Sequence, residues 1–354
     1  MKTIKKLLAL ALVLCMMFCL SVAVFADGES TPTEPTEPEE TTYDDMTQVT
    51  ITKVYKLIGA GSSPAETFTL EQVGAGVVKS GDATSAPALG TITGATFAAG
   101  AANADGARGN ITIALPKYER VGIYEYTLKE TVGSTAGVTY RSENIKLVVT
   151  VIEQNGKVCV AAVHTEEAKE DGSYDTTKGE GSTKSDTFEN TYSAGKLNIT
   201  KIVTGKLGDT SKYFKFTLKL EQDTLEDKTF AGNFNVSSQG SYVDKEGNKN
   251  PAAVTFGDNV FWLKDGETIT IENIPYGVKY TVTEDSYSAD GYTTTMTGDS
   301  GTINAAEQTA AFTNYKDGEI DTGISLDSLP YILALAVAFG GAVVLFSRKR
   351  HVED

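Results

Sequence analysis

Hydrophobic and polar residues alternate in many short stretches of this chain, which is the pattern of half-buried β-strands. Stretches such as VTITKVYKL and KLVVTVIE fill residues 47–165. After the polar segment at 166–186, the pattern begins again with LNITKIV and ends with TAAFTN. No stretch shows the 3.6-residue period of a long amphipathic helix. The pattern predicts an all-β fold with two tandem immunoglobulin-like β-sandwich domains, at residues 47–193 and 194–317.

The segment at residues 74–109 is the exception to this alternation. It is rich in Gly, Ala, Ser and Thr and has little periodicity. We therefore expect it to be loop with a single strand at most.

Each predicted domain places three polar side chains in the apolar phase of its strands. Successive side chains of a strand point to opposite faces, so Lys53 shares its face with Val49 and Ile51, opposite Thr50 and Thr52. By the same reasoning, a glutamate on a middle strand and the asparagine of a Phe-x-Asn sequence on the last strand also point inward. The residues concerned are Lys53, Glu130 and Asn190 in the first domain, and Lys201, Glu284 and Asn314 in the second.

The repetition of this set makes an incidental origin a poor explanation. A single inward lysine near a strand end can extend its amine to water. Two sets in the same order require another account, because an unpaired buried ammonium or carboxylate costs several kcal/mol. Burial lowers the pKa of a lysine and raises that of a glutamate, which favours a neutral amine beside a protonated carboxyl.

A neutral amine, a protonated carboxyl and an amide are arranged for transamidation. We expect Glu130 and Glu284 to act as catalytic residues that polarise the asparagine carbonyl and relay a proton while the amine attacks. Ammonia leaves, and an amide joins Lys53 to Asn190 and Lys201 to Asn314. Each reaction occurs once per chain, so the protein is not an enzyme with turnover.

The charge of the chain excludes a role in nucleic-acid binding and fits a soluble surface. The formal net charge is −16 and the sequence pI is about 4.7, whereas binding to phosphates requires a basic face. The sequence has three cysteines and two histidines. We therefore expect no metal site and no cofactor.

Both termini predict export to the cell surface. Residues 1–26 form a signal peptide, with three early lysines, an apolar run and a cleavage site before Asp27. Residues 27–46 are rich in Pro, Glu and Thr and predict a disordered linker. Only Cys159 remains in the mature chain, so an internal disulfide is excluded.

The last segment, residues 318–354, resembles an anchoring signal. Its apolar run at Leu329–Phe346 is long enough to cross a bilayer as a helix. The basic residues after it predict that the tail lies in the cytoplasm and the rest of the chain outside. The simplest alternative is a single-pass membrane anchor that is retained.

The ordered sets resemble the isopeptide-linkage (CnaB-like) domains of Gram-positive pilins and surface adhesins. In each domain the resemblance rests on ITK in the first strand, TLKE or TVTE in a middle strand, and Phe-x-Asn in the last. The resemblance implies self-formed Lys–Asn bonds between the first and last strands. The two-domain length and both terminal signals are most similar to a streptococcal-type major pilin, the backbone subunit of a pilus.

The resemblance also implies a sortase as partner, with other copies of the chain as a covalent polymer. Cleavage is expected between Thr322 and Gly323, although Asp321 stands where the family usually has proline, which leaves the sortase class open. The acceptor lysine for the next subunit is expected shortly before the Asn strand of the first domain, at Lys184 or, failing that, Lys178. Minor pilins and a host-surface ligand are further expected partners.

Two other interpretations were compared with this one. A monomeric adhesin, anchored to the wall or membrane, would use the same cross-linked domains as a stalk. The sequence Gly298–Gly301, GDSG, is also found around the serine of trypsin-like proteases. Because His164 lies in no catalytic context, we interpret GDSG as a turn.

Overall fold

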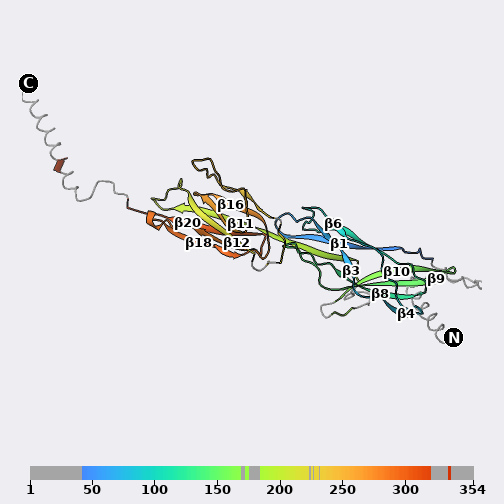
Figure 1. The fold of residues 1–354 in the computed structure, drawn as a ribbon. Helices are drawn as coiled ribbons and strands as arrows, with labels where there is room; N and C mark the ends of the chain where they lie inside the picture. Colours follow the sequence, from blue (N-terminus) through green and yellow to red (C-terminus); the bar gives the residue numbers. More distant parts are fainter. Residues whose placement is uncertain are drawn as a thin grey trace, which may run out of the picture. The chain divides into compact units, whose positions relative to one another are not determined.

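The computed structural model describes residues 42–168, 172–174, 184–222, 225, 227–230, 232–319 and 334–335. Within these residues the fold is all-β, with twenty strands and one short 3₁₀ helix at Ser288–Asp290 (Figure 1). The predicted signal peptide, the linker up to residue 41, Lys178, the Thr322–Gly323 cleavage site and all but residues 334–335 of the predicted transmembrane run at Leu329–Phe346 lie outside the described residues. In the part of the chain that is described, no helix is both long and apolar enough to cross a membrane.

The first hydrophobic core lies between two sheets. On one side are strands of a large mixed sheet: β1 (Gln48–Gly59), β5 (Ile92–Thr93), β7 (Ala107–Ala114) and the first part of β11 (Thr187–Thr204). On the other side are β3 (Leu70–Gln72), β4 (Val77–Gly81), β8 (Gly122–Glu130), β9 (Ile145–Gln154) and β10 (Lys157–Glu167). A separate pair consists of β2 (Glu66–Phe68) and β6 (Ala95–Phe97). Tyr55, Phe68 and Tyr126 are among the fully buried aromatic residues of this core.

The second hydrophobic core repeats this arrangement with the remaining strands. The large sheet continues with the second part of β11, then β13 (Phe234–Ser238), β14 (Ala253–Val254), β16 (Thr268–Pro275), β18 (Thr293–Thr297) and β20 (Glu307–Tyr315). Facing it are β12 (Phe214–Glu221), β15 (Gly257–Leu263), β17 (Lys279–Glu284) and β19 (Ser300–Thr302). Phe214, Phe216 and Phe312 are fully buried in this core.

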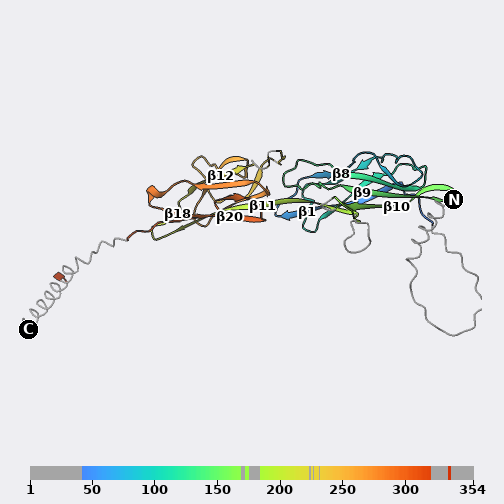
Figure 2. The same ribbon diagram turned by 90° about the horizontal axis from the view of Figure 1, so that it is seen from below.

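Strand β11 belongs to both cores. Its first residues pair in parallel with β1, and from Lys196 onward it pairs in parallel with β20, so both ribbon views show it between β1 and β20 (Figures 1 and 2). Even-numbered residues of β11 are buried up to Ala194, and odd-numbered residues from Gly195. A register shift in its pairing with β16 between Gly195 and Leu197 accompanies this change of phase. The predicted boundary near residue 194 therefore falls inside a continuous strand.

Two sequence predictions about local structure are corrected. The segment at residues 74–109 contains β4, β5, β6 and the start of β7, because strands of two to five residues are too short to show a visible alternation. The end of the predicted disordered linker is ordered: Met46 donates its backbone N–H to the carbonyl of Val160 at 3.2 Å, and Asp45 accepts the N–H of Val160 at 2.8 Å.

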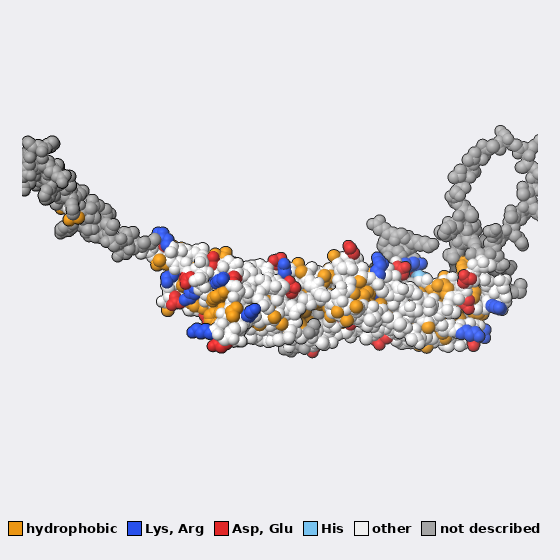
Figure 3. All heavy atoms as spheres, turned by 90° about the horizontal axis from the view of Figure 1, so that it is seen from above, with side chains coloured by type: hydrophobic (Ala, Val, Ile, Leu, Met, Phe, Trp, Pro, Cys, Tyr) orange, Lys and Arg blue, Asp and Glu red, His pale blue; other side chains and the backbone are white. Residues whose placement is uncertain are grey.

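The described surface carries charges of both signs. Lys and Arg side chains are interspersed with Asp and Glu on the face drawn in Figure 3, without a continuous basic stripe there. Gly298 and Asp299 of the GDSG sequence form the short connection after β18, with Gly298 at a φ of 66°, and Ser300 and Gly301 begin β19. The interpretation of GDSG as a turn therefore holds for its first two residues, whereas its last two belong to a strand.

Candidate functional site

The six polar residues predicted to point inward form two buried clusters. The first joins Lys53 on β1, Glu130 on β8 and Asn190 on β11. The second joins a lysine, a glutamate and an asparagine from β11, β17 and β20, namely Lys201, Glu284 and Asn314. Each of these side chains is exposed by 2% or less.

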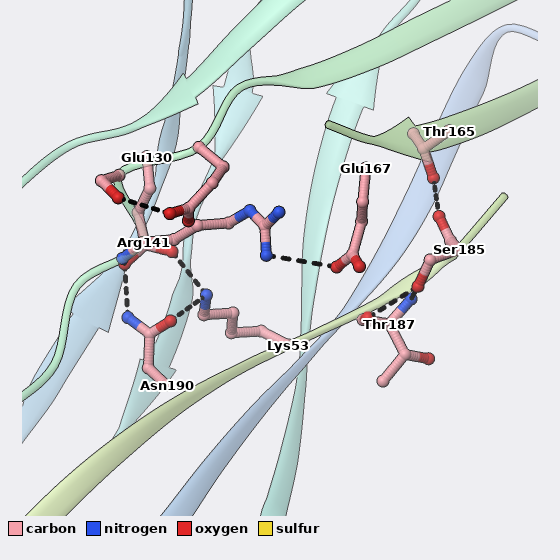
Figure 4. Close-up of polar contacts among 10 residues, drawn as sticks. Lys53, Glu130, Arg141, Thr165, Glu167, Ser185, Thr187 and Asn190 are labelled. Atoms are coloured by element: carbon pink, nitrogen blue, oxygen red, sulfur yellow. Dashed lines mark hydrogen bonds and ion pairs between the residues drawn. The ribbon is translucent and has the colours of Figure 1, made fainter. Parts of the chain in front are cut away.

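In the first cluster the three side chains form a closed ring of hydrogen bonds (Figure 4). The amine of Lys53 donates to Glu130 Oε2 at 2.5 Å and to Asn190 Oδ1 at 2.6 Å. Asn190 Nδ2 donates to Glu130 Oε1. The lysine and the amide nitrogen therefore contact different oxygens of one carboxyl group.

The second cluster has the same members with a different arrangement. Lys201 Nζ lies 3.0 Å from both oxygens of Glu284, and Asn314 Nδ2 donates to Glu284 Oε1 at 2.5 Å. The carbonyl oxygen Oδ1 of Asn314 is buried and finds no hydrogen-bond partner among the described residues. The carboxyl group again touches both the amine and the amide nitrogen.

The strand register explains the repeated Phe-x-Asn sequence. Lys53 lies opposite Phe188 in the parallel pairing of β1 with β11, and Asn190 follows two residues later on the same face. Lys201 lies opposite Phe312 in the parallel pairing of β11 with β20, and Asn314 follows in the same way. Each phenylalanine is buried beside its lysine, and the spacing of two brings the amide within reach of the amine.

Burial changes the proton affinity of these groups in the directions that transamidation requires. Desolvation lowers the pKa of Lys53 and of Lys201, and the neighbouring glutamate opposes the shift in each case. Desolvation also raises the pKa of Glu284, while Lys201 and Asn314 oppose this shift. Aromatic rings line both amines: Lys53 Nζ lies 5.2 Å from the ring centre of Phe68, and Lys201 Nζ 4.3 Å from that of Phe214.

The contacts of the glutamates bear on the proton transfer expected of them. The sequence predicts that each carboxyl both polarises the asparagine carbonyl and relays a proton, and both carboxyls contact the amide nitrogen. A carboxyl in this position can accept a proton from the lysine and deliver one to the nitrogen that leaves. The arrangement therefore favours assistance to the leaving group over activation of the carbonyl.

The expected acceptor lysine lies close to the first cluster along the chain. Lys184 is exposed and forms an isolated antiparallel bridge with Glu166, just before β11 begins at Thr187. Ser185 continues the attachment, because its N–H donates to the carbonyl of Thr165 at 3.1 Å. Figure 4 shows Thr165, Ser185 and Thr187 side by side at the start of the strand that carries Asn190.

One residue near the first cluster was missed at the sequence level. Arg141 follows β8 in a connecting segment, and its backbone N–H donates to Glu130 Oε1 at 3.4 Å. A strand pattern reveals the direction of a side chain, but a connection has no such periodicity. The sequence therefore offers no signal that would place Arg141 beside Glu130.

Comparisons with known families cover most of the two cores. Residues 49–193 match the family described as Spy0128-like isopeptide containing domain. Residues 195–316 match the family described as Domain of unknown function (DUF7601).

Individual relatives come from Streptococcus pyogenes. A pilin of serotype M1 is 30% identical over 253 residues, which span 66% of this chain and 69% of the pilin. The pilus tip adhesin Cpa is 31% identical over 139 residues, which span 37% of this chain and 18% of the adhesin. The crystal structure of the major pilin has a TM-score of 0.46 and 23% identity, and the match covers 77% of this chain and 99% of that chain. On the identity and coverage of the serotype M1 pilin, this chain belongs to the pilin family of Gram-positive bacteria, whose members are structural proteins and not enzymes.

Proposed function

We propose that this pilin is the backbone subunit of a sortase-assembled pilus, strengthened by two self-formed isopeptide bonds. One observation carries the proposal: a buried Lys–Glu–Asn cluster occurs twice, in the same strand register and with a carboxyl group that contacts both the amine and the amide nitrogen. The bonds would join Lys53 to Asn190 and Lys201 to Asn314. In each core they would link the first strand to the last in a CnaB-like, immunoglobulin-like sandwich.

The reaction follows from the contacts of each carboxyl group. The lysine ammonium passes a proton to the glutamate, and the neutral Nζ attacks Cγ of the asparagine. The glutamate then delivers a proton to Nδ2, the Cγ–Nδ2 bond breaks and ammonia leaves. Nζ gives up two protons in total, one to the departing nitrogen and one that converts ammonia to ammonium in water. The glutamate returns to its starting state.

The neutral product explains why the clusters are compatible with a folded core. A buried ion pair is costly to desolvate, whereas an amide keeps only one N–H and one C=O to satisfy. The glutamate remains as their neighbour. The bond thus removes the buried charge of the lysine.

Assembly would use the two ends of this arrangement. We propose that sortase cleaves between Thr322 and Gly323 and joins Thr322 to Lys184 of the next subunit, with Lys178 as the alternative acceptor. The support is the exposure of Lys184 and its position six residues before Asn190, on a segment attached to β10. The predicted apolar segment at Leu329–Phe346 would hold the chain in the membrane until cleavage.

The bonds are tested by the intact mass of a recombinant chain spanning residues 27–322. Each bond expels one ammonia, about 17 Da, so we expect a deficit of about 34 Da from the sequence mass. In Glu130→Ala and in Glu284→Ala one bond should fail to form, so the deficit from the variant's own sequence mass should fall to about 17 Da. The unmodified sequence mass in the parent chain would contradict the proposal.

A monomeric adhesin is the second candidate, favoured by the similarity to part of a pilus tip adhesin. Co-expression of the full chain with a pilus sortase distinguishes the two. A backbone subunit gives a ladder of covalent polymers that resists sodium dodecyl sulfate and is lost in Lys184→Arg but kept in Lys178→Arg. A single band in the parent chain would favour the adhesin, and loss of the ladder only in Lys178→Arg would move the acceptor to Lys178.

A further inference from the structure

Arg141 makes contacts that link the first cluster to β10. Its guanidinium Nη1 lies 3.2 Å from Glu167 Oε1, at the end of β10, and its side chain is mostly buried. The guanidinium carbon lies 5.4 Å from the ring centre of Phe188, the residue opposite Lys53. Figure 4 shows the side chain extending from the segment beside Glu130 across to Glu167.

The main chain of Arg141 contacts Glu130 Oε1, the oxygen next to the nitrogen that would leave. Its N–H donates to Glu130 Oε1 at 3.4 Å, and this same oxygen accepts Asn190 Nδ2. Oε2 is left to the lysine amine. The carboxyl is thereby held with one oxygen toward each nitrogen, and the side-chain contacts of Arg141 fix the backbone that holds it.

The second cluster has no equivalent cation among the described residues that act on it. The charged neighbours there are acidic: Asp265 acts on Lys201, and Asp285 acts on Glu284. Glu284 accepts only Lys201 and Asn314 among the hydrogen bonds of the described residues. The two clusters therefore contain the same types of reacting group but have neighbours of opposite charge.

We propose that Arg141 is a positioning residue for bond formation in the first cluster, and that the second cluster forms its bond without such a residue. This inference rests on the proposed function, because it assumes that both bonds form. Arg141 orients Glu130 through its backbone and places a fixed positive charge beside the reacting amine.

The positive charge has a predictable effect on the amine. The charged groups that face Lys53 are Glu130 on β8, Arg141 on the connection and Glu167 on β10. The two glutamates raise the pKa of Lys53, whereas burial and Arg141 lower it. Removal of the guanidinium should therefore raise this pKa, so that a higher pH is needed to supply the neutral amine.

The test measures the rate of bond formation in the full chain, and the second bond serves as an internal reference. Chains are translated in a short cell-free pulse and diluted into buffers from about pH 6 to pH 9, then quenched in denaturant at intervals. Mass spectrometry of the digest counts the Lys53–Asn190 and Lys201–Asn314 cross-linked peptides. The variants are Arg141→Met, which keeps length without charge, and Arg141→Lys, which keeps the charge.

For Arg141→Met we expect the first bond to form roughly tenfold more slowly at neutral pH, with its pH profile moved to higher pH. Arg141→Lys should keep the parent pH profile, and the second bond should be unchanged in both variants. The proposal is overturned if the first bond forms in Arg141→Met at the parent rate and with the parent profile. An equal loss at every pH, with Arg141→Lys no better than Arg141→Met, would assign a purely structural role and also overturn it. Absence of both bonds from the parent chain would instead overturn the proposed function, and this inference with it.

Discussion

At the scale of single residues, the two asparagines differ in how their carbonyl oxygens are held. Asn190 Oδ1 accepts a hydrogen bond from Lys53, whereas Asn314 Oδ1 is buried and has no partner in the part of the chain that the structure describes. A buried acceptor without a partner costs about 1–3 kcal/mol. Replacement of Asn314 by alanine removes this acceptor together with the reacting amide, and it leaves the Lys201–Glu284 ion pair in place. Asn314→Ala therefore isolates the contribution of the bond better than a change at the lysine would.

We expect Asn314→Ala to lower the melting temperature of the second core by roughly 15–20 °C. The proposed bond closes a loop of about 110 residues, and closing such a loop removes about 5 kcal/mol of unfolded-state entropy. Differential scanning calorimetry of the parent and the variant measures the difference. The matched control is Asn198→Ala, on the opposite, half-buried face of the same strand pairing, which removes hydrogen bonds to Glu307 and Thr270 but no proposed bond. An equal effect of the two changes would argue against a bond at Asn314.

The difference in melting temperature between the parent and Asn314→Ala should become smaller as the pH rises from about 7 to 10. Burial lowers the pKa of Lys201 from its ordinary value of 10.5, so the folded variant releases this proton at a lower pH than the unfolded chain does. Between these two values the unfolded chain holds one more proton, and the free energy of unfolding rises with pH. With the proposed bond formed, the parent chain would have no amine to titrate at this position.

The control for this pH effect is Asn314→Ala combined with Lys201→Met, which removes the titrating group. Its melting temperature should differ from the parent by an amount that does not narrow over the same range. If the difference in melting temperature between the parent and the double variant shrinks by the same amount, the pH effect belongs to other groups.

At the scale of elements, β11 carries both an asparagine for the first core and a lysine for the second. This is possible because its buried face changes at Ala194 and Gly195, where the register with β16 shifts. Gly195 has a steric reason to be glycine, since a Cβ at this position would collide with the carbonyl oxygen of Ala305. The change of phase therefore depends on a residue without a side chain.

We expect Gly195→Ala to destabilise the chain by about 1–3 kcal/mol, because the backbone at Ala305 must move. Urea unfolding followed by tryptophan fluorescence reports the change, since Trp262 lies on β15 in the second core's facing sheet. Ser193→Ala, two residues earlier on β11, keeps the backbone contacts and serves as the control. A midpoint for Gly195→Ala within error of the Ser193→Ala value would show that the strand tolerates a side chain here.

The elements also show why sequence reasoning reached the clusters and missed their surroundings. Strand phase is a local property with a period of two, so the inward direction of Lys53 and Glu284 could be predicted from their neighbours alone. The continuity of β11 could not, because a change of phase at Ser-Ala-Gly looks the same as a break between domains. Arg141 lies in a connection, where position depends on tertiary contacts that no short sequence pattern encodes.

At the scale of the whole molecule, the proposed bonds would decide where tension travels. A pull that enters at Lys184 reaches Asn190 along the start of β11 and continues along this strand to Lys201. From there the proposed bond carries it to Asn314, close to the end of the described part of the second core. Residues 202–313 are left outside the loaded path. The proposed bond between parallel neighbouring strands would thus protect the second core from extension.

Single-molecule pulling between handles at residues 184 and 319 should therefore give no unfolding step from the second core of the parent chain. In Asn314→Ala the load must pass through residues 202–313, and unfolding should release roughly 400 Å of chain, from about 3.6 Å per residue. Asn190→Ala is the matched control: its bond lies beside the loaded path and not in it, so the second core should stay inextensible. A long step in the parent chain, or in Asn190→Ala but not in Asn314→Ala, would show that force does not follow the Lys201–Asn314 connection.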